Sequence, residues 1–217
     1  MKLVFVLAVA ASLQDINAAQ RPIHRESTEW TDAWFPNSNG KDLPRVLLIG
    51  DSITRAYFPA VEKALAGKAY AGRIATSKAI GDPVLPQEIA LLASEYKFDV
   101  IHLNIGMHGW EYSEEDYKTY LPELVAAVRK AAPEAKLIWA STTPVRKDRE
   151  KGASNSRIER RNAIAREFCK AAGIPIDDLY ATIAPHVELH SDDIHFNSEG
   201  SALLAKQVAD SILPLLQ

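Results

Sequence analysis

A serine near the start of the chain and a histidine near its end have the surroundings expected of a hydrolase. Ser52 stands in Gly50-Asp51-Ser52-Ile53-Thr54, directly after the apolar run 46–49. Asp192 precedes His195 by three residues, in the loop before the last helical segment. A serine hydroxyl needs a base to become a good nucleophile, and an imidazole oriented by a carboxylate is such a base. We therefore predict Ser52 as nucleophile, His195 as general base and acid, and Asp192 as orienting carboxylate.

Other interpretations of these residues remain open in the sequence. Asp51, Ser52 or Thr54 would each satisfy the start of a helix as a capping residue. Asp193 competes with Asp192 for the orienting role, although the spacing favours Asp192. The Gly-x-Ser-x-Gly pentapeptide of another hydrolase class does not occur.

Composition indicates one globular domain. The chain has 217 residues, 47% of them hydrophobic and 24% charged, which is enough for a sizeable core. The net charge is −3 and the pI is near 6.1, whereas nucleic-acid-binding proteins usually carry a basic patch. We therefore expect no nucleic-acid partner.

The first 19 residues resemble an export signal. Lys2 is followed by the apolar stretch 3–11 and, further on, by Ala18 and Ala19, the pattern of a signal peptide cut near Ala19. A buried N-terminal helix or strand is the alternative. The stretch is too short for a membrane span, which takes about 20 apolar residues. We expect an exported protein, periplasmic or secreted. Its single cysteine, Cys169, then forms no internal disulfide and is predicted to be a buried, inert thiol.

The remaining chain alternates between strand and helix patterns. Nearly continuous apolar runs are typical of parallel strands covered on both faces, and the helices between them supply the crossovers. The predicted class is α/β: a three-layer α/β/α sandwich, flavodoxin-like, with a mostly parallel central sheet in one domain, 20–217. Residues 20–44 are predicted to form an N-terminal arm on the surface. The expected strands are 45–50, 69–75, 99–104 and 136–141; the expected helices are 54–66, 86–96, 114–132, 155–172 and 198–216.

Ligands of open parallel sheets bind beyond the carboxyl ends of the strands, and the loops there carry the residues described above. In these segments the sequence resembles the SGNH hydrolases, the GDSL esterase/lipase superfamily. Gly50-Asp51-Ser52-Ile53-Thr54 resembles the first family block and Asp192-Asp193-Ile194-His195 the last. The resemblance implies a Ser52–His195–Asp192 triad, and an oxyanion hole formed by the backbone N–H groups of Ser52 and of Gly81, the second-block glycine. It implies no cofactor.

The third family block departs from its usual Gly-x-Asn-Asp form. The chain has Gly106-Met107-His108-Gly109, so His108 takes the place of the asparagine that donates to the oxyanion. The form Asn-x-Gly-x-His resembles a branch of exported bacterial SGNH proteins. We predict His108 as the third oxyanion donor, with Asn104 in reserve. The alternative is a structural His108. A metal site built from His102, His108, His190 and His195 is not favoured, because no compact ligand motif is present.

The substrate is predicted from the loops around this edge. Tyr57, Trp110 and Arg146 are candidate substrate-binding residues, with Arg55, Glu111 and Lys147 as further candidates for the pocket. We expect an esterase that removes short acyl groups, above all acetyl, from a carbohydrate or another small-molecule ester. A lysophospholipase, a thioesterase, a hydrolase of other esters including sulfate esters, and a catalytically weak carbohydrate-binding protein are the alternatives.

Overall fold

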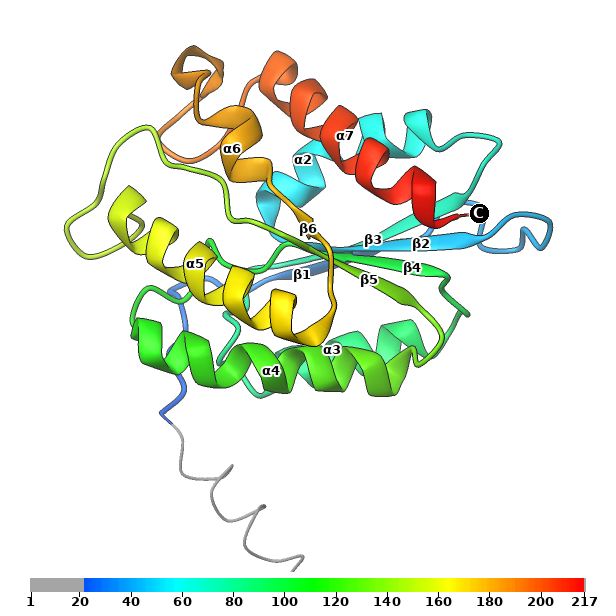
Figure 1. Cartoon of the computed structure of the whole chain (residues 1–217), viewed down its shortest axis with the longest axis horizontal. Helices are drawn as coiled ribbons and strands as arrows, with labels where there is room; N and C mark the ends of the chain where they lie inside the picture. The colour runs from blue at the N-terminus through cyan, green and yellow to red at the C-terminus, as the bar shows by residue number, and fades with distance from the viewer. Residues whose placement is uncertain (1–21, 217) are drawn as a thin grey trace, which may run out of the picture.

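The computed structural model describes residues 22–216, which form a three-layer α/β/α sandwich (Figure 1). Its central sheet has the strand order β1-β3-β2-β4-β5-β6, in which only β1 runs antiparallel to its neighbour. The strands are β1 Thr31–Trp34, β2 Arg45–Gly50, β3 Tyr70–Thr76, β4 Val100–Leu103, β5 Lys136–Ala140 and β6 Ile176–Asp177. The predicted fold class is confirmed.

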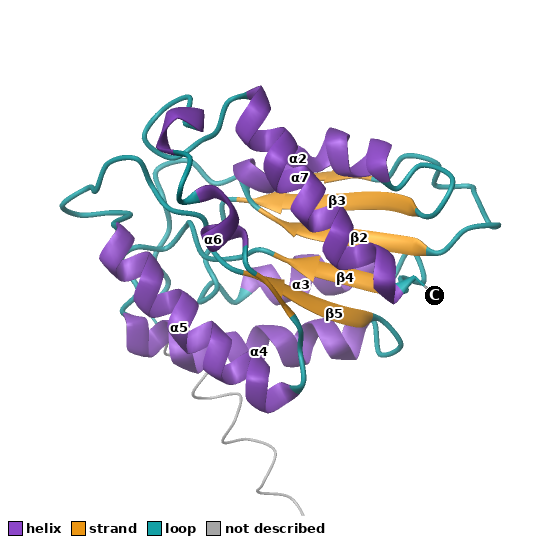
Figure 2. Ribbon diagram, turned by 45° about the horizontal axis from the view of Figure 1, so that its top comes forward, coloured by secondary structure: helices purple, strands orange, loops and turns teal. Residues whose placement is uncertain are grey.

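Helices cover both faces of this sheet, as Figure 2 also shows. One layer contains α2, α6 and α7, and the other contains α3, α4 and α5 (Figure 1). The helices are α2 Ser52–Ala64, α3 Val84–Ala93, α4 Glu114–Ala131, α5 Asn155–Ala172, α6 Leu179–Ile183 and α7 Ser198–Ile212, with 3₁₀ turns η1 Val187–Leu189 and η2 Leu213–Leu215. The predicted helices all occur, with end points that shift by a few residues.

Strand β2 shows why the buried strands read as continuous apolar runs. Leu47 and Ile49 pack into the core beneath α3 and α4, whereas Val46 and Leu48 pack into the core beneath α2 and α7. Successive side chains of a strand point to opposite faces, so a strand covered on both sides needs an apolar residue at each position. This burial fixes the turn after Gly50 at one edge of the sheet.

The N-terminal arm is tied to the sheet more closely than expected. Strand β1 pairs antiparallel with the edge strand β3, with Thr31 opposite Thr76 and Trp34 opposite Arg73. Its side chains are mostly exposed, so the hydrophobic pattern used to identify the other strands is absent here. The arm that precedes β1 thereby reaches the carboxyl ends of the parallel strands.

The structure tests the prediction for the thiol but not the prediction for the N-terminal segment. The predicted signal peptide lies outside the described residues. Within residues 22–216, no helix combines the length and apolar character needed to cross a bilayer. Cys169 is buried in α5 as a free thiol, and burial raises its pKa to about 11, which leaves it protonated and inert.

Candidate active site

At the turn from β2 into α2, the residue that caps the helix is not the serine predicted as nucleophile. The side chain of Asp51 caps α2 by accepting a hydrogen bond from the backbone N–H of Ile53, at 2.8 Å. The Thr54 hydroxyl is paired with Tyr57 inside the core. Because Asp51 caps the helix, the Ser52 hydroxyl is available to another partner. It lies at the start of α2, where the first backbone N–H groups favour negative charge.

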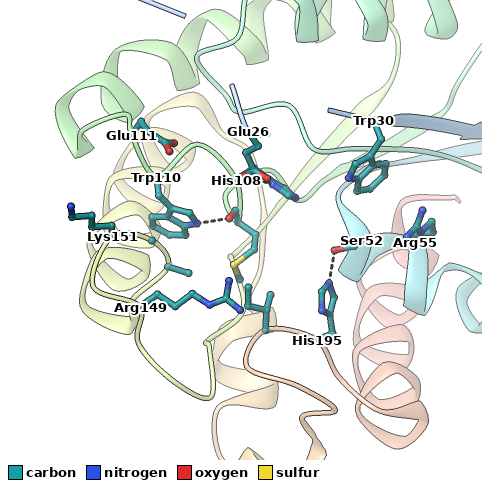
Figure 3. Close-up of a pocket in the computed structure, with 14 residues that line it drawn as sticks. Glu26, Trp30, Ser52, Arg55, His108, Trp110, Glu111, Arg149, Lys151 and His195 are labelled. Carbon is teal, nitrogen blue, oxygen red and sulfur yellow. Dashed lines mark hydrogen bonds and ion pairs between the residues drawn. The ribbon is translucent and has the colours of Figure 1, made fainter. Parts of the chain in front are cut away.

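That partner is His195, from a loop 143 residues further along the chain. The Ser52 Oγ lies 2.8 Å from Nε2 of His195, and Figure 3 draws this contact as a dashed line. The other ring nitrogen, Nδ1, lies 2.8 Å from Oδ2 of Asp192. The structure thus brings together the hydroxyl, imidazole and carboxylate that the sequence predicted as a triad.

The loop itself holds the Asp192 carboxylate in place. Its Oδ1 accepts the backbone N–H groups of Ile194 and His195, each at 2.7 Å. Burial acts to raise the pKa of Asp192, but these N–H groups and the His195 ring outweigh it and keep the pKa well below the usual range. Asp192 is therefore a stable anion beside the imidazole.

Asp193 makes different contacts, which separates the two neighbouring acids. Its carboxylate lies 3.3 Å from the Arg146 guanidinium and 4.0 Å from that of Arg149. Its backbone carbonyl accepts the N–H of Arg146 at 2.8 Å. Arg146, a predicted substrate-binding residue, therefore joins the loop after β5 to the histidine loop, and it does not line the pocket beside Ser52.

A cavity of about 500 Å³ opens in front of Ser52 and His195 (Figure 3). Its walls come from the N-terminal arm, the start of α2, the loop after β4 and the loop after β5. The lining residues are Glu26, Trp30, Ser52, Arg55, Met107, His108, Trp110, Glu111, Arg149, Lys151, Gly152, Ala153, Ile194 and His195. The wall is mixed in charge and carries two indole rings, so it suits a polar ligand with a ring to stack against.

His108 lies in this wall between Glu26 and the serine side of the cavity (Figure 3). Its Nδ1 is 2.7 Å from Oε1 of Glu26. Burial acts to lower the pKa of His108, but the hydrogen bond to Glu26 and the charges of Asp51, Glu26 and Glu29 outweigh burial and raise it. The structure therefore places His108 in the wall of the cavity that contains Ser52, and its surroundings shift the ring toward the protonated form, whereas its role as an oxyanion donor stays a prediction.

A buried arginine of α5 fixes the loop that carries His108. Arg161 is 1% exposed and donates to the carbonyl oxygens of Gly109 and Tyr112 at 3.0 and 2.9 Å, with a longer contact to His108 at 3.4 Å. Its guanidinium also stacks on the Trp110 ring, 4.2 Å from the centroid. Burial lowers the pKa of Arg161 to about 10, which leaves the side chain charged at neutral pH.

Three predicted site residues are not among those that line the cavity. Gly81 lies in the turn before α3, where an added Cβ would approach the rings of Tyr112 and Tyr120 to 2.7 and 2.8 Å, and it borders a separate depression. Asn104 is 3% exposed beneath the site. Tyr57 is fully buried, bonded to Thr54 at 2.9 Å, so the prediction that it stacks on substrate is wrong.

Other cavity residues were predicted or missed for clear reasons. Trp110 lines the wall as predicted from its position, and its Nε1–H donates to the Met107 carbonyl at 2.6 Å. Glu26 and Trp30 were missed, because the pairing of β1 with β3 that brings them there leaves no hydrophobic pattern. The Trp30 ring carries the Arg55 guanidinium 4.8 Å from its centroid. An indole in the cavity wall with an arginine over its ring is a signal only once the fold is known.

The remaining histidine interpretation concerned a metal. Within residues 22–216, no cluster of three or more histidine, cysteine or acidic side chains is arranged to hold one. His102 is fully buried and its Nε2 lies 2.9 Å from Asp177, whose carboxylate also accepts from Gln207 and Ser211. This polar cluster links β4 to β6 and α7 by hydrogen bonds.

The chain shares its family and its fold with known proteins. The profile described as the GDSL-like lipase/acylhydrolase family matches residues 48–203. A GDSL-like lipase from Bacteroides thetaiotaomicron has a similar structure, with a TM-score of 0.65 at 16% identity over 79% of this chain and 89% of that one. A carbohydrate esterase family 3 protein from Talaromyces cellulolyticus gives 0.64 at 18% over 80% and 98%. An acetyl xylan esterase gives 0.62 at 17% over 77% and 99%. No curated protein matches the chain.

The fold, the arrangement of Ser52 and His195, and the extent of the family match define one class of protein. The chain belongs to the GDSL-like lipase/acylhydrolase family, within the SGNH superfamily. It is an SGNH-type hydrolase that acts on esters.

Proposed function

We propose that this enzyme hydrolyses carboxylic esters through a covalent acyl-enzyme formed on Ser52. One observation carries the proposal: the continuous hydrogen-bonded chain from Ser52 Oγ through His195 to Asp192, with both contacts at 2.8 Å. A hydroxyl, an imidazole and a fixed carboxylate at these distances are the requirements for nucleophilic catalysis by serine.

In the first half-reaction, Ser52 Oγ attacks the ester carbonyl carbon while His195 Nε2 takes its proton. The π electrons of the carbonyl move onto its oxygen, which the Ser52 N–H and His108 stabilise. Collapse of the tetrahedral intermediate breaks the bond to the alcohol oxygen, and His195 returns the proton to it. The anionic Asp192 holds the ring and stabilises the imidazolium that forms in between.

In the second half-reaction, water takes the place of the alcohol. His195 removes a proton from the water as its oxygen attacks the acyl carbon. The second intermediate collapses with loss of Ser52 Oγ, which takes the proton back and releases the acid.

We propose a short acyl group, above all acetyl, on a carbohydrate or another polar alcohol. Arg55 and Lys151 line the cavity, and within residues 22–216 no carboxylate forms an ion pair with either side chain. The indoles of Trp30 and Trp110 offer flat apolar faces of the kind on which sugar rings stack. The carbohydrate esterase and acetyl xylan esterase among the similar structures are consistent with this class, and export remains part of the proposal.

The test compares acetylated oligosaccharides, lysophospholipids, acyl thioesters and aryl sulfates as substrates of the purified protein, with p-nitrophenyl acetate as a general ester. We expect the highest kcat/KM on the acetylated oligosaccharides and loss of turnover in Ser52→Ala. Glycan binding with no turnover on any ester would contradict the proposal. Cleavage that survives in Ser52→Ala would contradict the mechanism.

A further inference from the structure

The two ring nitrogens of His108 have very different surroundings. Nδ1 lies 2.7 Å from the Glu26 carboxylate. Nε2 is buried and has no hydrogen-bond partner within the described residues. Buried polar atoms in folded proteins nearly always have a partner, so one without a partner at the wall of a reaction cavity is a candidate for binding substrate or intermediate.

The protonation state of His108 decides what Nε2 is able to do. Hydrogen bonds and the nearby charge of His108, together with the Gly109 N–H, outweigh the effect of burial and lower the pKa of Glu26, so the carboxylate is ionised and accepts the Nδ1 proton. A neutral ring with its proton on Nδ1 has a lone pair on Nε2, which would repel an oxyanion. Only the imidazolium donates from both nitrogens. A histidine in the place of an asparagine amide therefore needs a nearby anion to work as a donor.

The N-terminal arm holds Glu26 against His108 from both sides. Before it, the backbone N–H of His24 donates to the Tyr112 hydroxyl at 3.0 Å. After it, the Trp30 N–H donates to Ser77 Oγ at 2.9 Å, and the Ser77 N–H donates to the Trp30 carbonyl at 3.0 Å. These anchors fix the chain on either side of Glu26, and strand β1 continues them along the sheet edge.

We propose, on the basis of the esterase function above, that Glu26 is a positioning residue for the oxyanion hole. Its carboxylate holds the His108 ring as the doubly protonated cation, with Nδ1–H bound to Glu26 and Nε2–H available to the oxyanion of the bound ester. The N-terminal arm is then part of the active site, and the histidine in the third block is a working donor because of it.

Several charged groups surround His108 and act on its protonation. Glu26 and Glu29 face it from the arm, Asp51 from the start of α2, and Arg161 from α5 through the His108 carbonyl. The charged or titratable side chains that share the cavity are Arg55, Glu111, Arg149, Lys151 and His195. Glu26 is the carboxylate in direct contact with the ring, so we assign the largest effect to it.

The first experiment measures the titration of the His108 ring by NMR in the full-length resting enzyme, without substrate. We expect Glu26→Gln to lower the His108 titration midpoint. Asp32→Asn is the matched control. Asp32 is a carboxylate of strand β1 that pairs with Arg73 of β3 at 2.7 Å and not with His108. An unshifted midpoint in Glu26→Gln, or an equal shift in Asp32→Asn, would overturn the inference.

The second experiment measures kcat across pH for the wild type and Glu26→Gln. The ratio of the Glu26→Gln kcat to the wild-type kcat cancels the ionisation of His195, which both enzymes share. We expect the ratio to fall as pH rises, by up to about 10²-fold, because loss of one oxyanion donor typically costs about 10²–10³-fold. In a His108→Asn background, whose amide donates without a charge, Glu26→Gln should have little effect at any pH.

The outcomes separate this inference from the proposed function. A ratio that does not change with pH, or an equal loss in the His108→Asn background, overturns the role of Glu26 while the esterase stands. Absence of wild-type turnover on every ester overturns the proposed function and the catalytic part of this inference with it. A shifted midpoint together with a pH-dependent ratio supports both.

Discussion

Two histidine–carboxylate pairs face the same cavity and are built in opposite ways. His195 and Asp192 are three residues apart, and the backbone of their own loop orients the carboxylate. His108 and Glu26 are 82 residues apart and meet only because strand β1 carries the arm along the edge of the sheet. The first pair depends on one loop, whereas the second depends on the fold.

The difference follows from what each ring does in the proposed mechanism. His195 must take up and release a proton in each half-reaction, so its carboxylate orients the ring and stabilises an imidazolium that forms only in passing. His108 must keep its proton throughout, so its carboxylate must favour the cation. A tight local loop suits the first requirement. The second requires a charge on the far side of the ring, which the local chain does not supply.

The largest effect is expected in the local pair. Asp192→Asn should reduce kcat by as much as about 10⁴-fold, because an amide at this position favours the wrong tautomer of His195. Asp193→Asn is the control, since Asp193 pairs with Arg146, and it should change kcat only slightly. Steady-state kinetics on one ester measure both. Equal losses in the two variants would show that either acid is able to orient the ring.

The next effect is in the remote pair. His108→Ala should lower kcat by about 10²–10³-fold, with a smaller change in KM, because an oxyanion donor acts mainly on the transition state. His108→Asn should recover part of the rate through the amide. Full activity in His108→Ala would show that His108 has only a structural role, and would leave the two pairs without a functional relation.

The two pairs also show what a sequence reveals and what it leaves out. The Ser52 and Asp192–His195 segments were identifiable because each is short and sits beside a strand or helix with a clear hydrophobic pattern. The parallel core was predictable for the same reason: Leu47 and Ile49 face one core, and Val46 and Leu48 the other. Both of these segments and the buried strands were therefore placed correctly.

Residues whose roles depend on distant packing were not. Glu26 has no local pattern, and its partner is set by an edge strand with polar, exposed side chains. Gly81 has the right sequence neighbours for an oxyanion glycine, but it lies against the rings of Tyr112 and Tyr120 and does not line the cavity beside Ser52, so its role stays a prediction. Tyr57 was misplaced for a local reason, because it follows Ser52 by a turn and a half but lies among the buried residues of α2, where its hydroxyl pairs with Thr54.

A third prediction concerns the scaffold of the remote pair. Arg161→Met should lower the free energy of unfolding by about 1–3 kcal/mol, because it removes the guanidinium that donates to the buried Gly109 carbonyl, whereas Arg157 still pairs with Glu114. Arg166→Met, on the same helix, removes an exposed pair with Asp178 and should cost less than about 1 kcal/mol. Denaturant unfolding measures both. Similar values for the two would mean that the His108 loop does not depend on Arg161.

The smallest effect is on the free energy of unfolding, whose pH dependence should have opposite signs for the two pairs. The pKa of His108 is raised in the folded protein, so its stabilising contribution is present below the ordinary histidine pKa and is lost as pH rises through the raised one. The pKa of Asp192 is lowered, so its contribution is present above the ordinary aspartate pKa and is lost as pH falls through the lowered one.

Unfolding of the wild type, Glu26→Gln and Asp192→Asn across pH tests this difference. The gap between wild type and Glu26→Gln should be widest in mildly acidic solution and close toward alkaline pH. The gap to Asp192→Asn should stay constant from neutral to alkaline pH and close only in strong acid. Both gaps should be below about 1 kcal/mol, since Glu26 and Asp192 are more than a third exposed and solvent screens their charges. If the difference in unfolding free energy between wild type and Glu26→Gln widened toward alkaline pH, His108 would be neutral in the folded enzyme. Both pairs would then consist of a neutral imidazole and a carboxylate, and would differ only in position.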